Sequence, residues 1–162
     1  MRKKLLFVCT GNVCRSPMAE GIFRKMLEDR GLAGRIEVDS AGTWALDGNP
    51  PTPLAVAAVA AMGAEIGGHR ARTVTMEDLR DADLVLVMEE AHRKSLFNLA
   101  PEFSRKVFLL SEMAGHHEDI ADPYGSYNLE DYVFTAEKIR KYLEQGWDEI
   151  MRKLGLESSG DG

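Results

Sequence analysis

The segment Cys9–Ser16 constrains this chain more than any other part of its sequence. It follows the unbroken apolar run 5–8, which is typical of a strand buried on both faces. After the segment, Ser16 is expected to be the N-cap of a helix and Pro17 its first residue. An apolar stripe at helical spacing then continues towards Gly31. The sequence therefore predicts a buried strand, a short loop and a helix N-terminus in direct succession.

Such a loop has the chemical properties of an anion site. The backbone N–H groups of the loop and of the first helical turn are unpaired donors, and the helix dipole adds a positive field. Gly11 and Asn12 are residue types that tolerate the left-handed backbone conformation that a loop around an anion needs. Arg15 supplies a planar fork of donors for two oxygens of a tetrahedral anion. The positive field also favours the thiolate form of Cys9, which predicts phosphoryl transfer to sulfur.

Strands and helices alternate along the rest of the chain. This pattern predicts an α/β fold with a four-stranded parallel sheet, helices on both faces and the phosphate-binding loop after strand 1. Ligands of such sheets bind beyond the carboxyl ends of the strands, where the Cys9 loop is expected. The expected later strands are 35–39, 83–88 and 106–110, and the expected helices are 54–62, a short one capped by Thr75 and Asp78, 91–98, and 129–154 with a bend at Gly146.

Length and charge exclude several other classes of protein. A chain of 162 residues fits a single domain, expected at 1–154, with 155–162 as a disordered tail. The 20 Lys and Arg against 26 Asp and Glu give a net charge of −6, which argues against nucleic-acid binding. The two cysteines, Cys9 and Cys14, form no disulfide framework, and no apolar stretch reaches transmembrane length. We therefore expect a soluble, monomeric cytoplasmic protein that binds no membrane.

Several segments together resemble the low-molecular-weight protein tyrosine phosphatases. Residues 8–20 look like the signature loop of that family, with Cys9 as the nucleophile and Arg15 as the phosphate-binding residue. Asp122-Pro123-Tyr124 resembles its general-acid loop, and 39–42, 48–51 and 69–72 also match its usual sequence. The resemblance covers about residues 4–153. It implies hydrolysis of a phosphoprotein or phosphopeptide through a phosphocysteine, with inorganic phosphate as product, Asp122 as general acid and then base, and no cofactor or metal.

The resemblance also implies roles for further residues. The phosphate-binding loop consists of Thr10, Gly11, Asn12, Val13, Cys14 and Ser16, of which Ser16 is expected to hydrogen-bond the Cys9 sulfur. Ser40 and His69 are expected to support this loop, and Val13, Trp44 and Tyr124 to line the substrate pocket.

The sequence leaves alternatives open for some of these side chains. Trp44 is either a wall of the pocket or a partly buried anchor for its loop. Cys14 either protects Cys9 as a reversible disulfide or is a small packing residue. The cluster 116–119 contains two histidines and two acids, but no matching ligand pair occurs elsewhere, so a solvated loop is favoured over a metal site.

Three rival functions share parts of this pattern. The bacterial protein arginine phosphatases have the same fold and mechanism, and Gly125-Ser126 resembles their sequence; they typically carry Thr where this chain has Val13, which favours phosphotyrosine. A thioredoxin-coupled arsenate reductase needs further cysteines, and none follows Cys14. A phosphate-binding module without turnover would not need the proton donor Asp122. The primary prediction is therefore a protein-tyrosine phosphatase.

Overall fold

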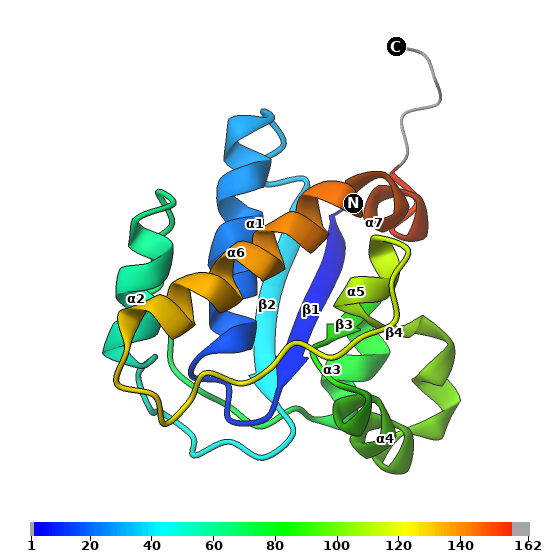
Figure 1. The fold of residues 1–162 in the computed structure, drawn as a ribbon. Helices are drawn as coiled ribbons and strands as arrows, with labels where there is room; N and C mark the ends of the chain where they lie inside the picture. Colours follow the sequence, from blue (N-terminus) through cyan, green and yellow to red (C-terminus); the bar gives the residue numbers. More distant parts are fainter. Residues whose placement is uncertain (1, 157–162) are drawn as a thin grey trace.

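The computed structural model describes residues 2–156, and in this range it contains one parallel sheet of four strands. The strands are β1 (Lys3–Cys9), β2 (Ile36–Gly42), β3 (Leu84–Val87) and β4 (Val107–Leu109), in the spatial order β2-β1-β3-β4. All three pairings are parallel (Figure 1). β1 and β3 lie inside the sheet, which explains why their sequences are continuous apolar runs.

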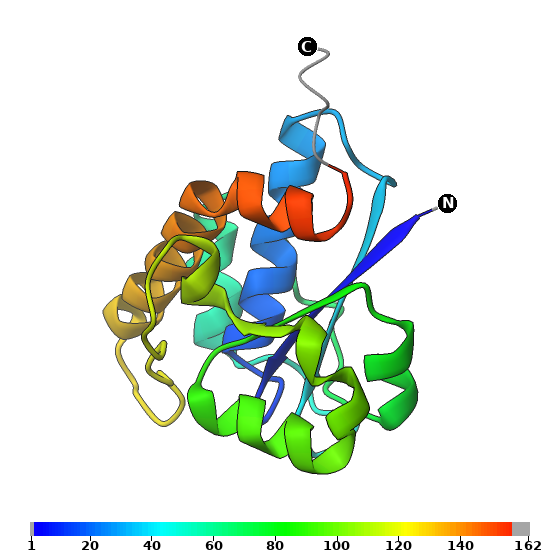
Figure 2. The same ribbon diagram turned by 90° about the vertical axis from the view of Figure 1, so that its right-hand side faces the viewer.

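Helices cover both faces of the sheet, so the predicted fold class is confirmed. Alternate β1 side chains point to opposite faces: Leu5 and Phe7 belong to one core cluster, Leu6 and Val8 to the other. The first core is completed by α1 (Arg15–Asp29), α2 (Pro53–Ala60), α5 (Leu110–Met113), α6 (Leu129–Gln145) and α7 (Trp147–Lys153). The second core is completed by α3 (Met76–Asp81), α4 (Glu90–Leu99) and the 3₁₀ helix η1 (Pro101–Lys106). Figures 1 and 2 show these two layers.

The start of α1 differs from the prediction. The helix begins at Arg15 with Cys14 as N-cap, and no side chain caps it. The prediction that Ser16 is the N-cap is therefore wrong. Its hydroxyl instead contacts the Cys9 sulfur and accepts a hydrogen bond from Asn12. The helix therefore begins two residues earlier than predicted, and its first turn includes Arg15.

The C-terminal helix is interrupted at the glycine where a bend was expected. α6 ends at Gln145 and α7 begins at Trp147. A Cβ on Gly146 would lie 2.6 Å from the Cβ and 2.8 Å from the carbonyl oxygen of Met113, so only glycine allows this close approach to α5. The predicted single helix 129–154 is therefore two helices.

A tail was predicted over residues 155–162, and residues 157–162 of it lie outside the described residues. Gly155 and Leu156 are part of the fold, because the Leu156 N–H donates to the Met151 carbonyl at 2.8 Å and the Leu156 side chain packs against the core. Among residues 2–156, no helix is both long enough and apolar enough to cross a bilayer.

Candidate active site

The loop between β1 and α1 presents its backbone N–H groups to a pocket at the carboxyl end of the sheet. Within residues 2–156, the N–H groups of residues 11–14 donate to no other group. Five of the six carbonyls of residues 9–14 accept hydrogen bonds of 2.8–3.0 Å from outside the loop or from α1: Cys9 from Thr43 N–H, Thr10 from Trp44 N–H, Asn12 from His69, Val13 from Thr52 N–H and Cys14 from Met18 N–H. Because these carbonyls are already hydrogen-bonded and the N–H groups of residues 11–14 are free, the loop presents mainly donors to an anion. We call this loop the cradle.

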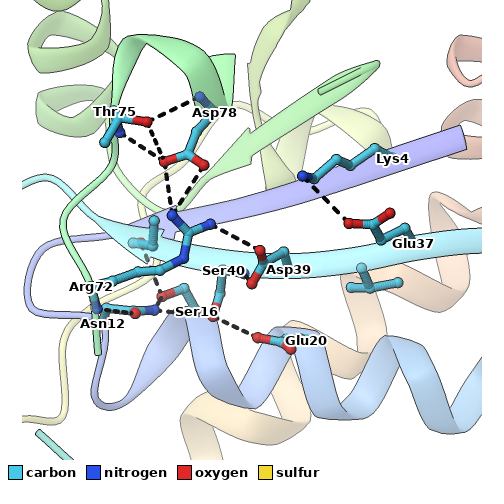
Figure 3. A network of polar contacts seen from close by, with 12 residues as sticks. Lys4, Asn12, Ser16, Glu20, Glu37, Asp39, Ser40, Arg72, Thr75 and Asp78 are labelled. Atoms are coloured by element: carbon cyan, nitrogen blue, oxygen red, sulfur yellow. Dashed lines mark hydrogen bonds and ion pairs between the residues drawn. The ribbon is translucent and has the colours of Figure 1, made fainter. Parts of the chain in front are cut away.

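Asn12 fixes the conformation of the cradle. Its φ of 59° is the only positive φ of a non-glycine residue in the described chain. Its buried side chain donates to the hydroxyls of Ser16 (2.8 Å) and Ser40 (3.0 Å) and accepts from the Arg72 N–H (3.0 Å; Figure 3). Gly11, in contrast, does not adopt a positive φ, so the expectation of a left-handed conformation holds for Asn12 alone.

A second set of polar side chains surrounds Asn12. The Ser40 hydroxyl donates to the buried carboxylate of Glu20 at 2.6 Å, and burial raises the pKa of that carboxyl. His69 Nε2 lies 2.8 Å from the Asn12 carbonyl. The Arg72 guanidinium bridges Asp78 of α3 and Asp39 of β2, with contacts of 2.9–3.0 Å (Figure 3). The structure thus brings the expected support residues Ser40 and His69 to the loop.

Cys9 lies at the floor of the pocket. Its side chain is 3% exposed yet lines the pocket, and its sulfur is 2.9 Å from the Ser16 hydroxyl. A hydroxyl at this distance donates to a thiolate and stabilises it. The sulfur is therefore placed to attack a group bound in the cradle above it.

Arg15 reaches the same pocket from the first turn of α1. Its guanidinium is almost fully buried and pairs with Glu89, donates to the Ile120 carbonyl (2.7 Å) and lies 3.3 Å from Asp122. Its Nε has no hydrogen-bond partner among the described residues. A buried donor without a partner is costly, and an anion oxygen in the pocket would satisfy it.

The mouth of the pocket is formed by exposed side chains from two loops. Trp44 is 71% exposed and Tyr124 66% exposed, and both line the pocket, so the alternative of a partly buried anchor for Trp44 is wrong. Asp122 lies between the mouth and Arg15. Its carboxylate accepts from the Tyr124 N–H at 3.0 Å, a turn interaction that fixes the carboxylate close to the pocket.

Comparison with known proteins agrees with this geometry. The family model for low molecular weight phosphotyrosine protein phosphatase matches residues 4–159. The chain belongs to this family. It is therefore a hydrolase of the cysteine-dependent protein-tyrosine phosphatase class.

Three similar proteins illustrate the range of the family. A probable low molecular weight protein-tyrosine-phosphatase EpsP from Ralstonia nicotianae is 38% identical, covering 96% of this chain and 100% of the relative. A protein-arginine-phosphatase from Bacillus subtilis is 37% identical, covering 87% and 92%. The crystal structure of a low molecular weight protein tyrosine phosphatase from T. tengcongensis superimposes with a TM-score of 0.85 at 41% identity, covering 91% of this chain and 99% of that one.

The second cysteine of this phosphatase differs in character from the first. Cys14 is buried, and burial raises the pKa of its thiol to about 11 although a contact with Thr52 opposes the shift. Both cysteines are free thiols in the described structure. Cys14 is therefore a protonated thiol near neutral pH, and its redox role stays a prediction.

Sequence reasoning missed several residues of the phosphatase pocket. Leu46 and Asn49 line its mouth, and Glu89, Ile120 and His92 hold Arg15 and Thr10. One signal was available, because Glu89 directly follows the predicted strand 83–88 and the carboxyl ends of parallel strands meet at one edge. Contacts made by a backbone carbonyl, such as that of Ile120, leave no signal in the sequence.

The histidine and acid cluster of the phosphatase lies in the loop after α5. His117 is largely exposed and is within 3.5 Å of Glu112 and Glu90. Among residues 2–156, no group of three or more His, Cys, Asp or Glu side chains is arranged to hold a metal ion.

Proposed function

We propose that this protein hydrolyses phosphotyrosine in proteins, with Cys9 as nucleophile, Arg15 as phosphate ligand and Asp122 as general acid and base. One observation carries the proposal: the Cys9 sulfur lies below free loop amides, with Arg15 and Asp122 lining the same pocket. A phosphoryl group in the cradle receives hydrogen bonds from the loop and from Arg15. These donors stabilise the charge on its equatorial oxygens in the transition state.

In the first step, the Cys9 thiolate attacks phosphorus and forms a sulfur–phosphorus bond. The bond between phosphorus and the tyrosine oxygen breaks, and protonated Asp122 gives its proton to that oxygen. In the second step, Asp122 removes a proton from water, which attacks phosphorus and releases the thiolate and inorganic phosphate. The Ser16 hydroxyl stabilises the thiolate as it leaves. Atoms and charges balance over the two steps without a cofactor.

The side chains at the mouth support an aromatic substrate. Trp44, Leu46 and Tyr124 provide exposed apolar surface around the cradle, and Val13 lines the pocket beside them. Flat aromatic walls pack well against a phenyl ring. Among the described residues, Asp122 is the one carboxylate that lines this pocket, which leaves few acceptors for the guanidinium of phosphoarginine.

Phosphoarginine is the second candidate, because a similar protein carries the name protein-arginine-phosphatase. The discriminating residue is Val13, whose side chain lacks a hydroxyl that would orient a guanidinium. Turnover of one peptide carrying either phosphotyrosine or phosphoarginine distinguishes the substrates. We expect Val13→Thr to shift the ratio of kcat/KM towards phosphoarginine, with Val133→Thr on α6 as the matched control.

The experiment that tests the proposed function is the substitution Cys9→Ser. We expect it to abolish hydrolysis of a phosphotyrosine peptide while inorganic phosphate still binds, because the cradle amides and Arg15 remain. Cys14→Ser is the matched control, since it is the same substitution five residues further along the loop and leaves the nucleophile intact. Turnover by Cys9→Ser at the original rate would remove Cys9 from the mechanism.

The same chemistry suggests where and how the protein works. The proposed nucleophile must remain a reduced thiol, so we propose that the enzyme acts in the cytoplasm. We also propose that the enzyme acts as a monomer, because the pocket of one chain already holds the proposed nucleophile, phosphate ligand and general acid.

A further inference from the structure

His92 is a buried histidine that the proposed mechanism does not use. It is the third residue of α4 and is 3% exposed. Its Nδ1 accepts the backbone N–H of Glu89 at 3.0 Å, so in the neutral ring the proton resides on Nε2. That Nε2–H is 2.8 Å from the Thr10 hydroxyl, to which it donates. The imidazole therefore has one defined tautomer and two partners.

Both partners of this imidazole belong to the phosphate site. Thr10 is the residue after Cys9 in the cradle, and it is 82 residues away from His92 in sequence. Glu89 forms the ion pair with Arg15. The ring thus joins the loop that carries the nucleophile to the backbone of the residue whose carboxylate pairs with the phosphate-binding arginine.

The surroundings of the ring keep it neutral. Burial lowers the pKa of His92 to about 4, and the charge of Arg15 acts in the same direction. The carboxylates of Glu89, Asp122 and Asp119 act in the opposite direction and are outweighed. A neutral ring can accept at Nδ1 while it donates at Nε2, whereas a protonated ring would lose the bond to Glu89.

We propose that His92 is a positioning residue that aligns Arg15 with the Cys9 loop through its simultaneous hydrogen bonds to Thr10 and to the Glu89 backbone. The inference rests on the proposed function of the pocket as a phosphate site. An ordinary core histidine would contribute to stability alone. A positioning residue also sets how well the pocket binds phosphate and how fast it turns over.

Two substitutions separate the two hydrogen bonds. His92→Asn places a polar group near the Nδ1 position and retains the bond to Glu89, but it is too short to reach Thr10. His92→Gln reaches the Nε2 position and retains the donor to Thr10. Thr10→Val removes the same hydrogen bond from the other end, and His117→Asn on the surface is the matched control.

The readouts are the dissociation constant of inorganic phosphate by calorimetry, and kcat and KM for a phosphotyrosine peptide. We expect His92→Asn and Thr10→Val each to weaken phosphate binding and lower kcat by about 10-fold, because each removes the hydrogen bond between His92 and Thr10. We expect the double variant to show no further loss, because both changes remove one interaction. His92→Gln keeps the donor to Thr10 but loses the acceptor for the Glu89 N–H, so it should show a loss of similar size, because the proposal requires both bonds.

Several results would overturn the inference. They are additive losses in the double variant, unchanged phosphate binding in either His92→Asn or His92→Gln, or a lowered melting temperature with unchanged phosphate binding. If His92→Asn does not fold, Thr10→Val against Thr10→Ser tests the same bond. Phosphate binding requires no turnover, so this test remains valid even if the original protein fails to hydrolyse phosphotyrosine.

Discussion

The two halves of the active site are built in different ways. The cradle half is buried: Asn12 is 0% exposed, and its side chain has three hydrogen bonds to Ser16, Ser40 and Arg72. The acid half lies on the irregular loop between α5 and α6, where the Asp122 side chain is 39% exposed and Tyr124 is more exposed still. One half is fixed by a buried network, and the other by a turn and a single ion pair.

This difference separates two tasks. Stabilising a transition state requires donors that are already in place, because reorganising them costs free energy during the reaction. Transferring a proton and admitting a protein side chain require access to solvent and to the substrate. The predictions below test whether the cradle half sets the rate for every substrate and the acid half only for some.

The largest effect is expected for Arg15→Lys. A lysine retains one positive charge but loses the planar fork, so it cannot bind two phosphate oxygens while it also pairs with Glu89. We expect kcat to fall by about 10²–10³-fold for all substrates, whatever their leaving group. Steady-state kinetics check this, with Arg80→Lys on α3 as the control. A loss limited to poor leaving groups would contradict the division of tasks.

A loss that depends on the leaving group is expected for Asp122→Asn. The amide cannot donate the proton, so kcat for an alkyl or phenyl phosphate should fall by about 10²-fold. A nitrophenyl phosphate, whose leaving group needs little protonation, should be affected much less in the first step. The control is Asp119→Asn in the same loop, because Asp119 does not line the pocket. Equal losses on both substrates would show that Asp122 is not the acid.

A smaller effect is expected when Asn12→Ala is compared with Asn12→Gly. Both variants lose the three side-chain hydrogen bonds, but only glycine adopts a φ of 59° without strain. We expect Asn12→Ala to be less stable than Asn12→Gly by about 1–2 kcal/mol and to bind phosphate more weakly. Chemical denaturation and calorimetry measure the two differences. Identical values would mean that the loop conformation does not limit the cradle.

The last prediction concerns the pH dependence of stability and His92. The unfolded chain protonates this ring near pH 6.5, whereas in the folded protein the pKa is about 4. The contribution of His92 to stability is therefore fully present above pH 6.5 and is lost as the pH falls towards 4, by at most about 1.4 kcal/mol per pH unit. Denaturation at several pH values should show a shallower slope in this window for His92→Gln. An unchanged slope would show that folding does not lower the pKa of this ring.

Much of the fold was predictable because its signals are local. The apolar runs and the alternation of strands with helices gave the parallel sheet, and the Cys9–Ser16 segment gave the loop after its first strand. The interruption at Gly146 was less predictable. Its cause is a close approach to Met113, a contact between segments that are far apart in sequence.

The candidate site was predictable where side chains of unusual type occur together. Cys9, Arg15 and Asp122 were predicted, and the structure places them in one pocket. Glu89 and His92 were missed because a carboxylate and a histidine at the start of a helix usually cap that helix. These two cap α4 as well, so their contacts with Arg15 and Thr10 become visible only when the strands are assembled.

The measurement that tests the central claim most directly is the identification of the phosphorylated residue during turnover. A nitrophenyl phosphate is mixed with Asp122→Asn, in which the second step is slowed, and the reaction is quenched within one turnover. Peptide mass spectrometry should then find one phosphoryl group, attached to the Cys9 sulfur. A phosphoryl group on any other residue, or product release with Cys9 never modified, would contradict the mechanism.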